Sequence, residues 1–153
     1  MKYSNVVVAG GGVLGSQIAF QAAYCGFNVT IWLRSEGSIG RTQPKIDHLK
    51  QTYIEAIEKM AEDKNAWCAG LADEDTFDKE ECLKKVENAY ANLKLELDMA
   101  KAVSDADLVI ESMSEDPKAK IDVYQKLAPL LPEKALLASN SSPLLPSQFA
   151  KFT

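Results

Sequence analysis

Apolar and polar residues occur in blocks along the chain, and these blocks predict strands and helices in turn. Residues 5–9 (NVVVA) form a β-branched apolar run that glycines end, which predicts a buried strand. Small and apolar residues follow at helical spacing in residues 13–26, and Gly26 marks the expected end of this helix. Residues 28–33 (NVTIWL) predict a second strand. The first 33 residues therefore predict one βαβ unit.

The segment from Pro44 to Asn92 has no strand pattern and predicts two antiparallel helices. Residues 62–81, between the two helices, are polar and acidic, which predicts a solvated loop or a short helical turn. Apolar residues share one face of each helix: Ile46, Leu49, Tyr53, Ile57 and Met60 in the first, and Leu83, Val86, Tyr90 and Leu93 in the second.

Strands and helices alternate again from residue 93 onward. The last expected helix has Asp116 as its N-cap and Pro117 in its first turn. Strands alternating with helices indicate an α/β fold, a Rossmann-type doubly wound parallel sheet with a helical hairpin excursion after the second strand. The expected strands are residues 93–97, 107–112 and 134–140, and the expected helices are residues 99–106 and 115–131.

Composition narrows the class of protein only slightly. The chain has 153 residues, 46% hydrophobic and 25% charged, which is the balance of a globular domain with a core. A net charge of −5 argues against nucleic acid as a partner. The three cysteines lack metal-type spacing, so we expect reduced thiols in a cytoplasmic protein and no metal site. No secretory signal is seen, and no apolar run approaches the roughly 20 residues of a membrane span.

Gly10, Gly12 and Gly15 form the pattern G-x-G-x-x-G between the first expected strand and the first expected helix. In this context the pattern predicts dinucleotide binding, although a purely structural turn is the alternative. Gly10 permits the tight turn, Gly12 lets a pyrophosphate approach the backbone, and Gly15 lets helix and strand pack closely. The amides at the helix start, at Val13 and Leu14, would then face the anion.

The end of the second expected strand lacks the acidic residue that usually binds an unphosphorylated ribose. Leu33 stands there, and it cannot accept hydrogen bonds from ribose hydroxyls. Arg34 offers a planar donor fork suited to phosphate, and Ser35 adds a hydroxyl and an amide. We therefore expect NADP rather than NAD. The alternative is that Arg34 faces solvent and stacks on adenine, while NAD binds without the usual carboxylate.

Three segments, VAGGGVLGSQIAFQAAYCGFNVTIW, DADLVIESMSED and ASNSS, occur in this order. With them, the chain resembles the 3-hydroxyacyl-CoA dehydrogenase family over nearly its whole length, most weakly in the helical excursion. The resemblance implies a Rossmann domain followed by a helical dimerisation domain. It also implies an oxidoreductase that interconverts L-3-hydroxyacyl-CoA and 3-ketoacyl-CoA by hydride exchange with a nicotinamide.

The resemblance also suggests roles for single residues. It places Glu115 and Lys120 near the nicotinamide side of the cofactor, and Asn140 in a structural or cofactor-adjacent position. It identifies Ser142 as the catalytic residue that hydrogen-bonds the substrate's 3-oxygen. Each residue also has a plain interpretation. Glu115 precedes a helix N-terminus, where an anion is favourable, Lys120 is a surface lysine, and Ser142 is a turn residue before Pro143.

Some residues depart from the family pattern. Pro143 replaces the more usual serine, and SPLLPSQF also resembles relatives that act on carnitine or sugar acids and a lens-crystallin branch. A hydroxy-acid or carnitine-type dehydrogenase, or a non-catalytic NADP-binding relative, therefore remains an alternative. The excursion resembles the family's CoA-contacting hairpin, in which Lys45, Lys50 and Lys59 are candidates for the CoA phosphates.

The family's general acid–base histidine lies downstream of the ASNSS segment. The single histidine of the chain, His48, falls in the excursion and is expected to face solvent. We therefore expect residues 1–153 to be a truncated dinucleotide-binding domain without its catalytic and dimerisation part. Such a domain is expected to bind cofactor but to be inactive alone, and the full-length protein is expected to be a homodimer.

Overall fold

Five parallel strands form the centre of the structure, a computed structural model that describes residues 3–114, 116–140, 147 and 150. The strands lie in the order β3-β2-β1-β4-β5, so the chain builds outward on one side of β1 and then crosses to the other. Their bounds are β1 (Asn5–Ala9), β2 (Asn28–Trp32), β3 (Lys94–Glu96), β4 (Leu108–Glu111) and β5 (Leu136–Ser139). This is the Rossmann-type, doubly wound α/β fold that the sequence predicts.

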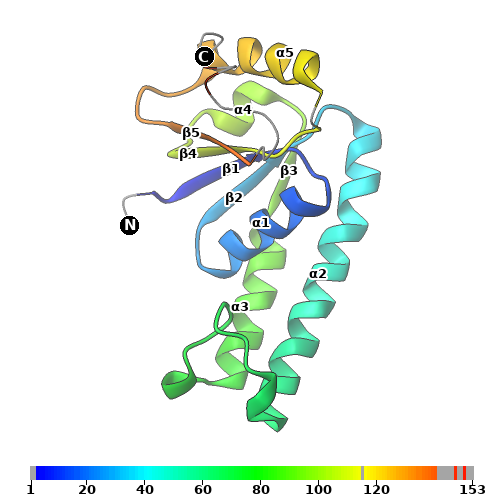
Figure 1. The fold of residues 1–153 in the computed structure, drawn as a ribbon, viewed down its shortest axis with the longest axis vertical. Helices are drawn as coiled ribbons and strands as arrows, with labels where there is room; N and C mark the ends of the chain where they lie inside the picture. The colour runs from blue at the N-terminus through cyan, green and yellow to red at the C-terminus, as the bar shows by residue number, and fades with distance from the viewer. Residues whose placement is uncertain (1–2, 115, 141–146, 148–149, 151–153) are drawn as a thin grey trace.

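Helices cover both faces of the sheet (Figure 1). Short 3₁₀ helices at Lys64–Ala66, Glu74–Thr76 and Ala128–Leu130 complete the elements of the described chain. No helix among the described residues is both long enough and apolar enough to cross a membrane. The α-helices are α1 (Val13–Tyr24), α2 (Glu36–Glu62), α3 (Lys79–Asn92), α4 (Met99–Val103) and α5 (Pro117–Leu127).

Alternate residues of β1 enter two different cores. Val6 and Val8 pack in the core formed with α1, α2 and α3, whereas Val7 and Ala9 pack in the core formed with α4 and α5. All four side chains are buried, because a parallel sheet covered by helices on both faces has no solvent-facing side. The apolar run that predicted a buried strand is explained by this double burial.

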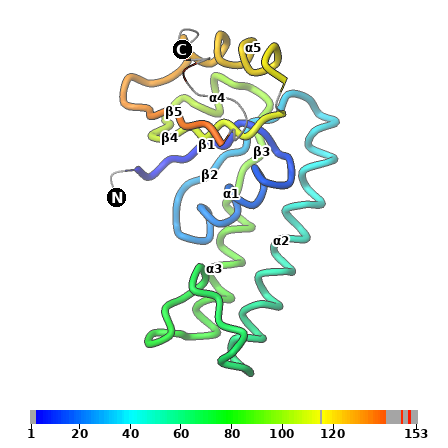
Figure 2. The backbone as a smooth tube through the Cα atoms, viewed as in Figure 1, coloured from blue at the N-terminus to red at the C-terminus, as the bar shows by residue number. Residues whose placement is uncertain are grey.

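Helices α2 and α3 form the predicted hairpin, which extends well beyond the sheet (Figure 2). Its buried centre includes Ile57 and Val86. The connection between the helices folds back onto the C-terminal end of α1. There, the Tyr24 hydroxyl donates a 2.7 Å hydrogen bond to the carbonyl oxygen of Leu71, and the Gln21 side chain donates to that of Gly70. The hairpin is therefore fixed to the Rossmann core at a second place.

The structure confirms the predicted strands to within two residues at each end and corrects the start of the first hairpin helix. α2 begins at Glu36, eight residues before Pro44, and Pro44 lies inside it. The exposed first turns of α2 lack the apolar spacing that marks a helix, so the sequence pattern missed them. Helices α4 and α5 end earlier than expected, at Val103 and Leu127, but two other predicted helix boundaries are confirmed. Asp116 accepts a 3.1 Å hydrogen bond from the Lys118 amide, and Gly26 ends α1 with φ = 94°.

Candidate functional site

The strand ends meet at one edge of the sheet. Ala9 lies in register with Trp32 on β2 and with Glu111 on β4, and Glu111 lies in register with Ser139 on β5. The residues that follow these four are Gly10, Leu33, Ser112 and Asn140, and they therefore share the carboxyl edge. The strand order reverses between β1 and β4, which is where open α/β sheets bind their ligands.

Two glycines of the turn after β1 are required by close backbone contacts. Gly10 has φ = 122°, and a Cβ on it would collide with the carbonyl oxygen of Ser112. A Cβ on Gly15 would collide with the carbonyl oxygen of Gly10. These contacts hold the first turn of α1 directly against the ends of β1 and β4, as the glycine pattern predicts.

Gly12 differs from these two because the space beside it is open. No heavy atom of the described residues lies within 4 Å of the position that a Cβ would take. Gly12 is the N-cap of α1, and no side chain caps the helix there. Val13 and Leu14 are 66% and 51% exposed, so the first turn of α1 faces solvent. The unsatisfied amides and the positive end of the helix dipole are thus available to an anion.

Gly11 connects the turn to α2, a role that sequence reasoning did not assign. A Cβ on Gly11 would collide with the side chains of Thr42 and Leu33, both of which are buried. The carbonyl oxygen of Gly11 accepts hydrogen bonds from the hydroxyls of Thr42 (3.0 Å) and Ser16 (3.1 Å). The sequence did contain a signal for this role, the run of three glycines at residues 10–12. Of these three, the dinucleotide-binding motif requires only Gly10 and Gly12, so Gly11 was left unexplained.

A cleft of about 270 Å³ opens at this edge, between the glycine turn and the start of α2. Its charged lining residues are Arg34, Arg41 and Lys45, and none of the described lining residues is acidic. The remaining lining comes from Gly10, Gly11, Gly12, Trp32, Leu33, Ser38, Thr42, Ser112, Met113 and Ser114. The cleft therefore combines an open helix N-terminus with three cations, an arrangement suited to a polyanionic ligand.

The residues expected to select the cofactor lie at the end of β2. Leu33 is buried and apolar, and Arg34 lines the cleft with its guanidinium 3.9 Å from the Asp122 carboxylate on α5. Ser35 is the N-cap of α2, and its hydroxyl lies 3.1 Å from that of Ser38. No acidic side chain takes the place that a ribose-binding carboxylate would need, since Leu33 fills it.

Glu111 ends β4 as a buried anion, and sequence reasoning gave it no role. One carboxylate oxygen accepts hydrogen bonds from the Lys120 ammonium (2.7 Å) and the Tyr124 hydroxyl (2.9 Å), and the other accepts one from the Met113 amide. Burial opposes ionisation, but these hydrogen bonds outweigh it and hold the pKa of Glu111 below its ordinary value. Burial and the nearby Glu111 carboxylate raise the pKa of Tyr124 to about 12.

The family resemblance also suggested roles for Lys120, Asn140, Glu115 and Ser142. Lys120 is 1% exposed, so the surface interpretation is wrong, and its ammonium contacts Glu111 inside the protein. Asn140 is exposed at the carboxyl edge, where its backbone N–H donates to the Glu111 backbone carbonyl oxygen at 2.8 Å. Glu115 and Ser142 lie outside the described residues.

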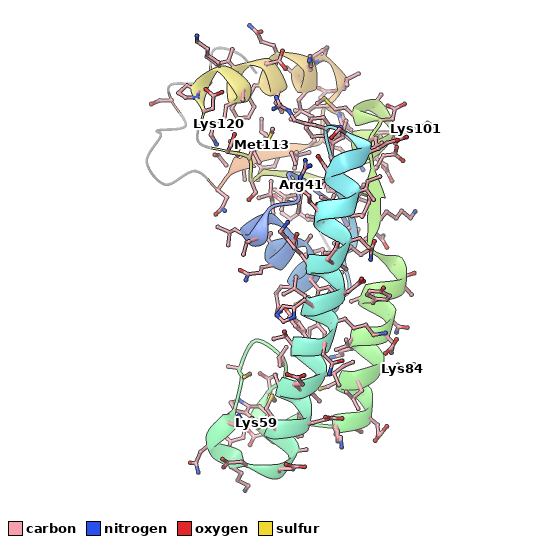
Figure 3. All side chains as sticks on the ribbon, turned by 90° about the vertical axis from the view of Figure 1, so that its right-hand side faces the viewer. Arg41, Lys59, Lys84, Lys101, Met113 and Lys120 are labelled. Atoms are coloured by element: carbon pink, nitrogen blue, oxygen red, sulfur yellow. The ribbon has the colours of Figure 1, made fainter. Side chains whose placement is uncertain are left out.

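The excursion residues do not form one cluster. His48 is exposed on α2 and does not line the cleft, as expected of a solvent-facing histidine. Lys45 lines the cleft, Lys50 forms a 2.9 Å ion pair with Glu87 of α3, and Lys59 lies near the far end of α2 (Figure 3). A single ligand phosphate therefore cannot contact all three lysines.

The glycine turn, the open start of α1 and the cleft at the reversal of strand order together define a Rossmann-type dinucleotide-binding domain. Residues 5–153 match the family described as "3-hydroxyacyl-CoA dehydrogenase, NAD binding domain", and the chain belongs to this family. The domain accordingly binds NAD(P).

Individual relatives agree with this assignment. The mitochondrial hydroxyacyl-coenzyme A dehydrogenase of Rattus norvegicus is 30% identical over 97% of this chain and 42% of its own length. The 3-hydroxybutyryl-CoA dehydrogenase of Clostridioides difficile is 29% identical over 97% of this chain and 45% of its own length. A solved structure of a diketoreductase, described with dicarbonyl compounds, is 35% identical and has a TM-score of 0.76 over 98% of this chain and 46% of its own. The chain thus spans less than half the length of these relatives.

Gly12 and Gly15 should respond differently to substitution. Gly12→Val should leave the fold intact but abolish NAD(P) binding, because the new side chain enters open space where the pyrophosphate would lie. Gly15→Ala should destabilise the domain by about 1–3 kcal/mol, because its Cβ meets the Gly10 carbonyl. Thermal unfolding and cofactor titration of both variants check this. A native-like Gly12→Val variant that still binds cofactor would count against the site.

The buried ion pair should contribute strongly to stability at neutral pH. Lys120→Met leaves Glu111 buried without its cation and should lower the free energy of unfolding by about 3–5 kcal/mol. Since the folded-state pKa of Glu111 is lowered, its contribution is present above the unfolded value of about 4.3 and is lost as the pH falls through the folded pKa. The loss in Lys120→Met should therefore shrink in urea unfolding at low pH.

Lys126→Met is the matched control on the same helix. Lys126 pairs with Asp122 at 2.9 Å, but both side chains are more than half exposed, so its loss should cost less than about 1 kcal/mol. Equal losses in Lys120→Met and Lys126→Met would show that the buried pair does not stabilise the carboxyl edge.

Proposed function

We propose that this chain supplies the cofactor-binding part of an NAD(P)-dependent oxidoreductase that interconverts L-3-hydroxyacyl-CoA and 3-ketoacyl-CoA. The observation that carries the proposal is the open start of α1 at the glycine turn, in a chain whose family match extends over residues 5–153. The names of the rat and clostridial relatives support an acyl-CoA substrate. When bound, the nicotinamide would accept or supply the hydride.

The residues of this chain would bind and orient the reactants. The amides of Val13 and Leu14 would face the pyrophosphate, which Gly12 lets approach. Glu111 and its donors keep the ends of β4 and β5 together, since the hydroxyl of Ser139 also lies 3.3 Å from a Glu111 oxygen. Asn140 follows directly at the edge, beside the proposed nicotinamide position.

Three further roles rest on the family resemblance. In this proposal Ser142 hydrogen-bonds the substrate's 3-oxygen, and Glu115 and Lys120 belong to the nicotinamide side of the site. For Lys120, the buried contact with Glu111 supports an action on the shape of the edge rather than on solvent-exposed ligand groups.

We further propose that the domain prefers NADP to NAD. Leu33 lies buried at the end of β2 and has no oxygen to accept a hydrogen bond from a ribose 2′-hydroxyl. Arg34, with Ser35 beside it, would instead face a 2′-phosphate. The other charged residues in the described lining of the cleft are Arg41 and Lys45. Both are cations, which supports binding of the additional phosphate of NADP.

A smaller carbonyl substrate is the second candidate. The diketoreductase is more similar in sequence to this chain than the rat enzyme is, at 35% against 30% identity. The lysine positions also favour it, because Lys45, Lys50 and Lys59 are dispersed along α2 rather than gathered for CoA.

We also propose that the protein is a cytoplasmic homodimer. Sedimentation tests the oligomeric state, and cell fractionation tests the localisation.

The NADP preference should depend on Arg34. Arg34→Ala should lower the ratio of NADPH to NADH affinity by about tenfold, the magnitude of a hydrogen bond to a charged group. Lys84→Ala, an exposed lysine of α3 away from the cleft, is the control for the loss of one charge and should leave the ratio unchanged. Isothermal titration of both cofactors checks this, and an unchanged ratio in Arg34→Ala would contradict the role of Arg34 in the preference.

Substrate class is tested with the protein in its full natural length. NAD(P)H oxidation should be faster with acetoacetyl-CoA than with free acetoacetate or a small 1,3-diketone, compared by kcat/KM, if the CoA moiety contributes binding energy. The reverse order would favour the second candidate. Turnover of none of these compounds by a cofactor-binding protein would favour the non-catalytic alternative.

A further inference from the structure

The guanidinium of Arg41, an exposed residue of α2, reaches back to the first turn of its own helix. Its Nη2 donates a 3.0 Å hydrogen bond to the hydroxyl of Ser38, one turn earlier. Its Nη1 lies 3.4 Å from the place that a Cβ of Gly37 would take, so the guanidinium covers the first turn. Figure 3 shows Arg41 near the sheet end of α2, and both Arg41 and Met113 line the cleft.

In the free protein this cation lies near charges of both signs, since Glu36 places a carboxylate in the same first turn. The first turn of a helix carries a partial positive charge, which repels a guanidinium. Among the described residues Arg41 forms no ion pair, whereas the Arg34 guanidinium lies 3.9 Å from the Asp122 carboxylate of α5. The ammonium of Lys45 donates to the carbonyl oxygen of Arg41 at 2.8 Å and adds more positive charge. An anionic group in the cleft would relieve this repulsion.

We propose that Arg41 is the principal residue that determines the preference for a phosphorylated ribose, with Arg34 as its secondary partner. This inference rests on the proposed function, and it names a residue that the end of β2 does not supply. Arg34 must share its charge between Asp122 and the ligand, while Arg41 has no competing ion-pair partner in the described part of the chain. The hydroxyls of Ser38 and Ser35, 3.1 Å apart, continue the polar surface from Arg41 toward Arg34.

The chemistry recognised is a phosphate monoester on the ribose of an adenosine. Such a group occurs as the 2′-phosphate of NADP and also as the 3′-phosphate of CoA. The structure favours the 2′-phosphate, because Arg41 shares its cleft with the glycine turn and with Leu33 at the end of β2. Those are the places of the pyrophosphate and adenine ribose of a dinucleotide.

The test uses three small probes: adenosine 2′,5′-bisphosphate, adenosine 3′,5′-bisphosphate and adenosine 5′-monophosphate. Titration calorimetry compares the wild type with Arg41→Gln, Arg34→Gln and the Lys84→Gln control. The wild type should bind the 2′,5′-bisphosphate best. Arg41→Gln should weaken it roughly 10- to 100-fold, as expected for charge-assisted hydrogen bonds, and should change the monophosphate less than about twofold. Arg34→Gln should weaken it less, and Lys84→Gln should not affect it.

The outcomes separate this inference from the proposed NADP preference. A wild type that binds the 2′,5′-bisphosphate no better than the monophosphate would refute both. A wild-type preference that survives in Arg41→Gln would refute only the role of Arg41. An Arg41-dependent preference for the 3′,5′-bisphosphate would overturn the inference in favour of a CoA phosphate. An equal loss of affinity for the 2′,5′-bisphosphate and the monophosphate would also overturn the inference, because Arg41 would then act on the shape of the cleft and not on the 2′-phosphate. Unchanged melting temperatures show that the exposed substitutions leave the fold intact.

Discussion

The carbonyl oxygens of Gly10 and Ser112 occupy space in which side chains would otherwise stand, and the remaining site depends on this close approach. It places the first turn of α1 at the ends of β1 and β4, where the strand order reverses. It also leaves Gly12 and the start of α1 open toward the cleft. Gly11 extends the same contact to α2, because Thr42 and Leu33 pack where its side chain would be. The long α2 is therefore fixed to the phosphate-binding turn itself.

Charge is distributed in two layers at this edge. Beneath the surface, the buried Glu111 carboxylate and Lys120 ammonium neutralise each other. The Tyr124 hydroxyl and the Met113 amide donate further hydrogen bonds to this carboxylate. Such a pair joins α5 to the end of β4 but presents no net charge to a ligand. On the cleft wall, Arg34, Arg41 and Lys45 present positive charge without a matching carboxylate among the described lining residues. A chain of net charge −5 thus directs a local positive field at its proposed ligand.

Much of this architecture could be predicted from the sequence, because its signals are local. Apolar runs predicted the strands, and the glycine spacing predicted the turn that α1 requires. The start of α2 could not be predicted, since its exposed first turns have no apolar period and Pro44 suggested a boundary. Arg41 was missed for the same reason, because its importance arises only when α2 begins at Glu36. The burial of Glu111 and Lys120 was also missed, since nine residues of sequence separation conceal a pair formed between β4 and α5. Glu115 and Ser142, inferred from resemblance, lie outside the described residues.

We propose that one ligand spans the glycine turn and the start of α2. Titration of the ¹⁵N-labelled chain with NADPH, followed by the chemical shifts of the backbone amides and of the Arg41 Nε–H group, tests this proposal. The largest shifts are expected at Gly12, Val13 and Leu14, together with shifts at Ser35, Ser38 and the Arg41 Nε–H group. NADH should reproduce the first set and only weakly the second. Shifts confined to the distal half of the α2–α3 hairpin, with the glycine turn unchanged, would contradict the proposal.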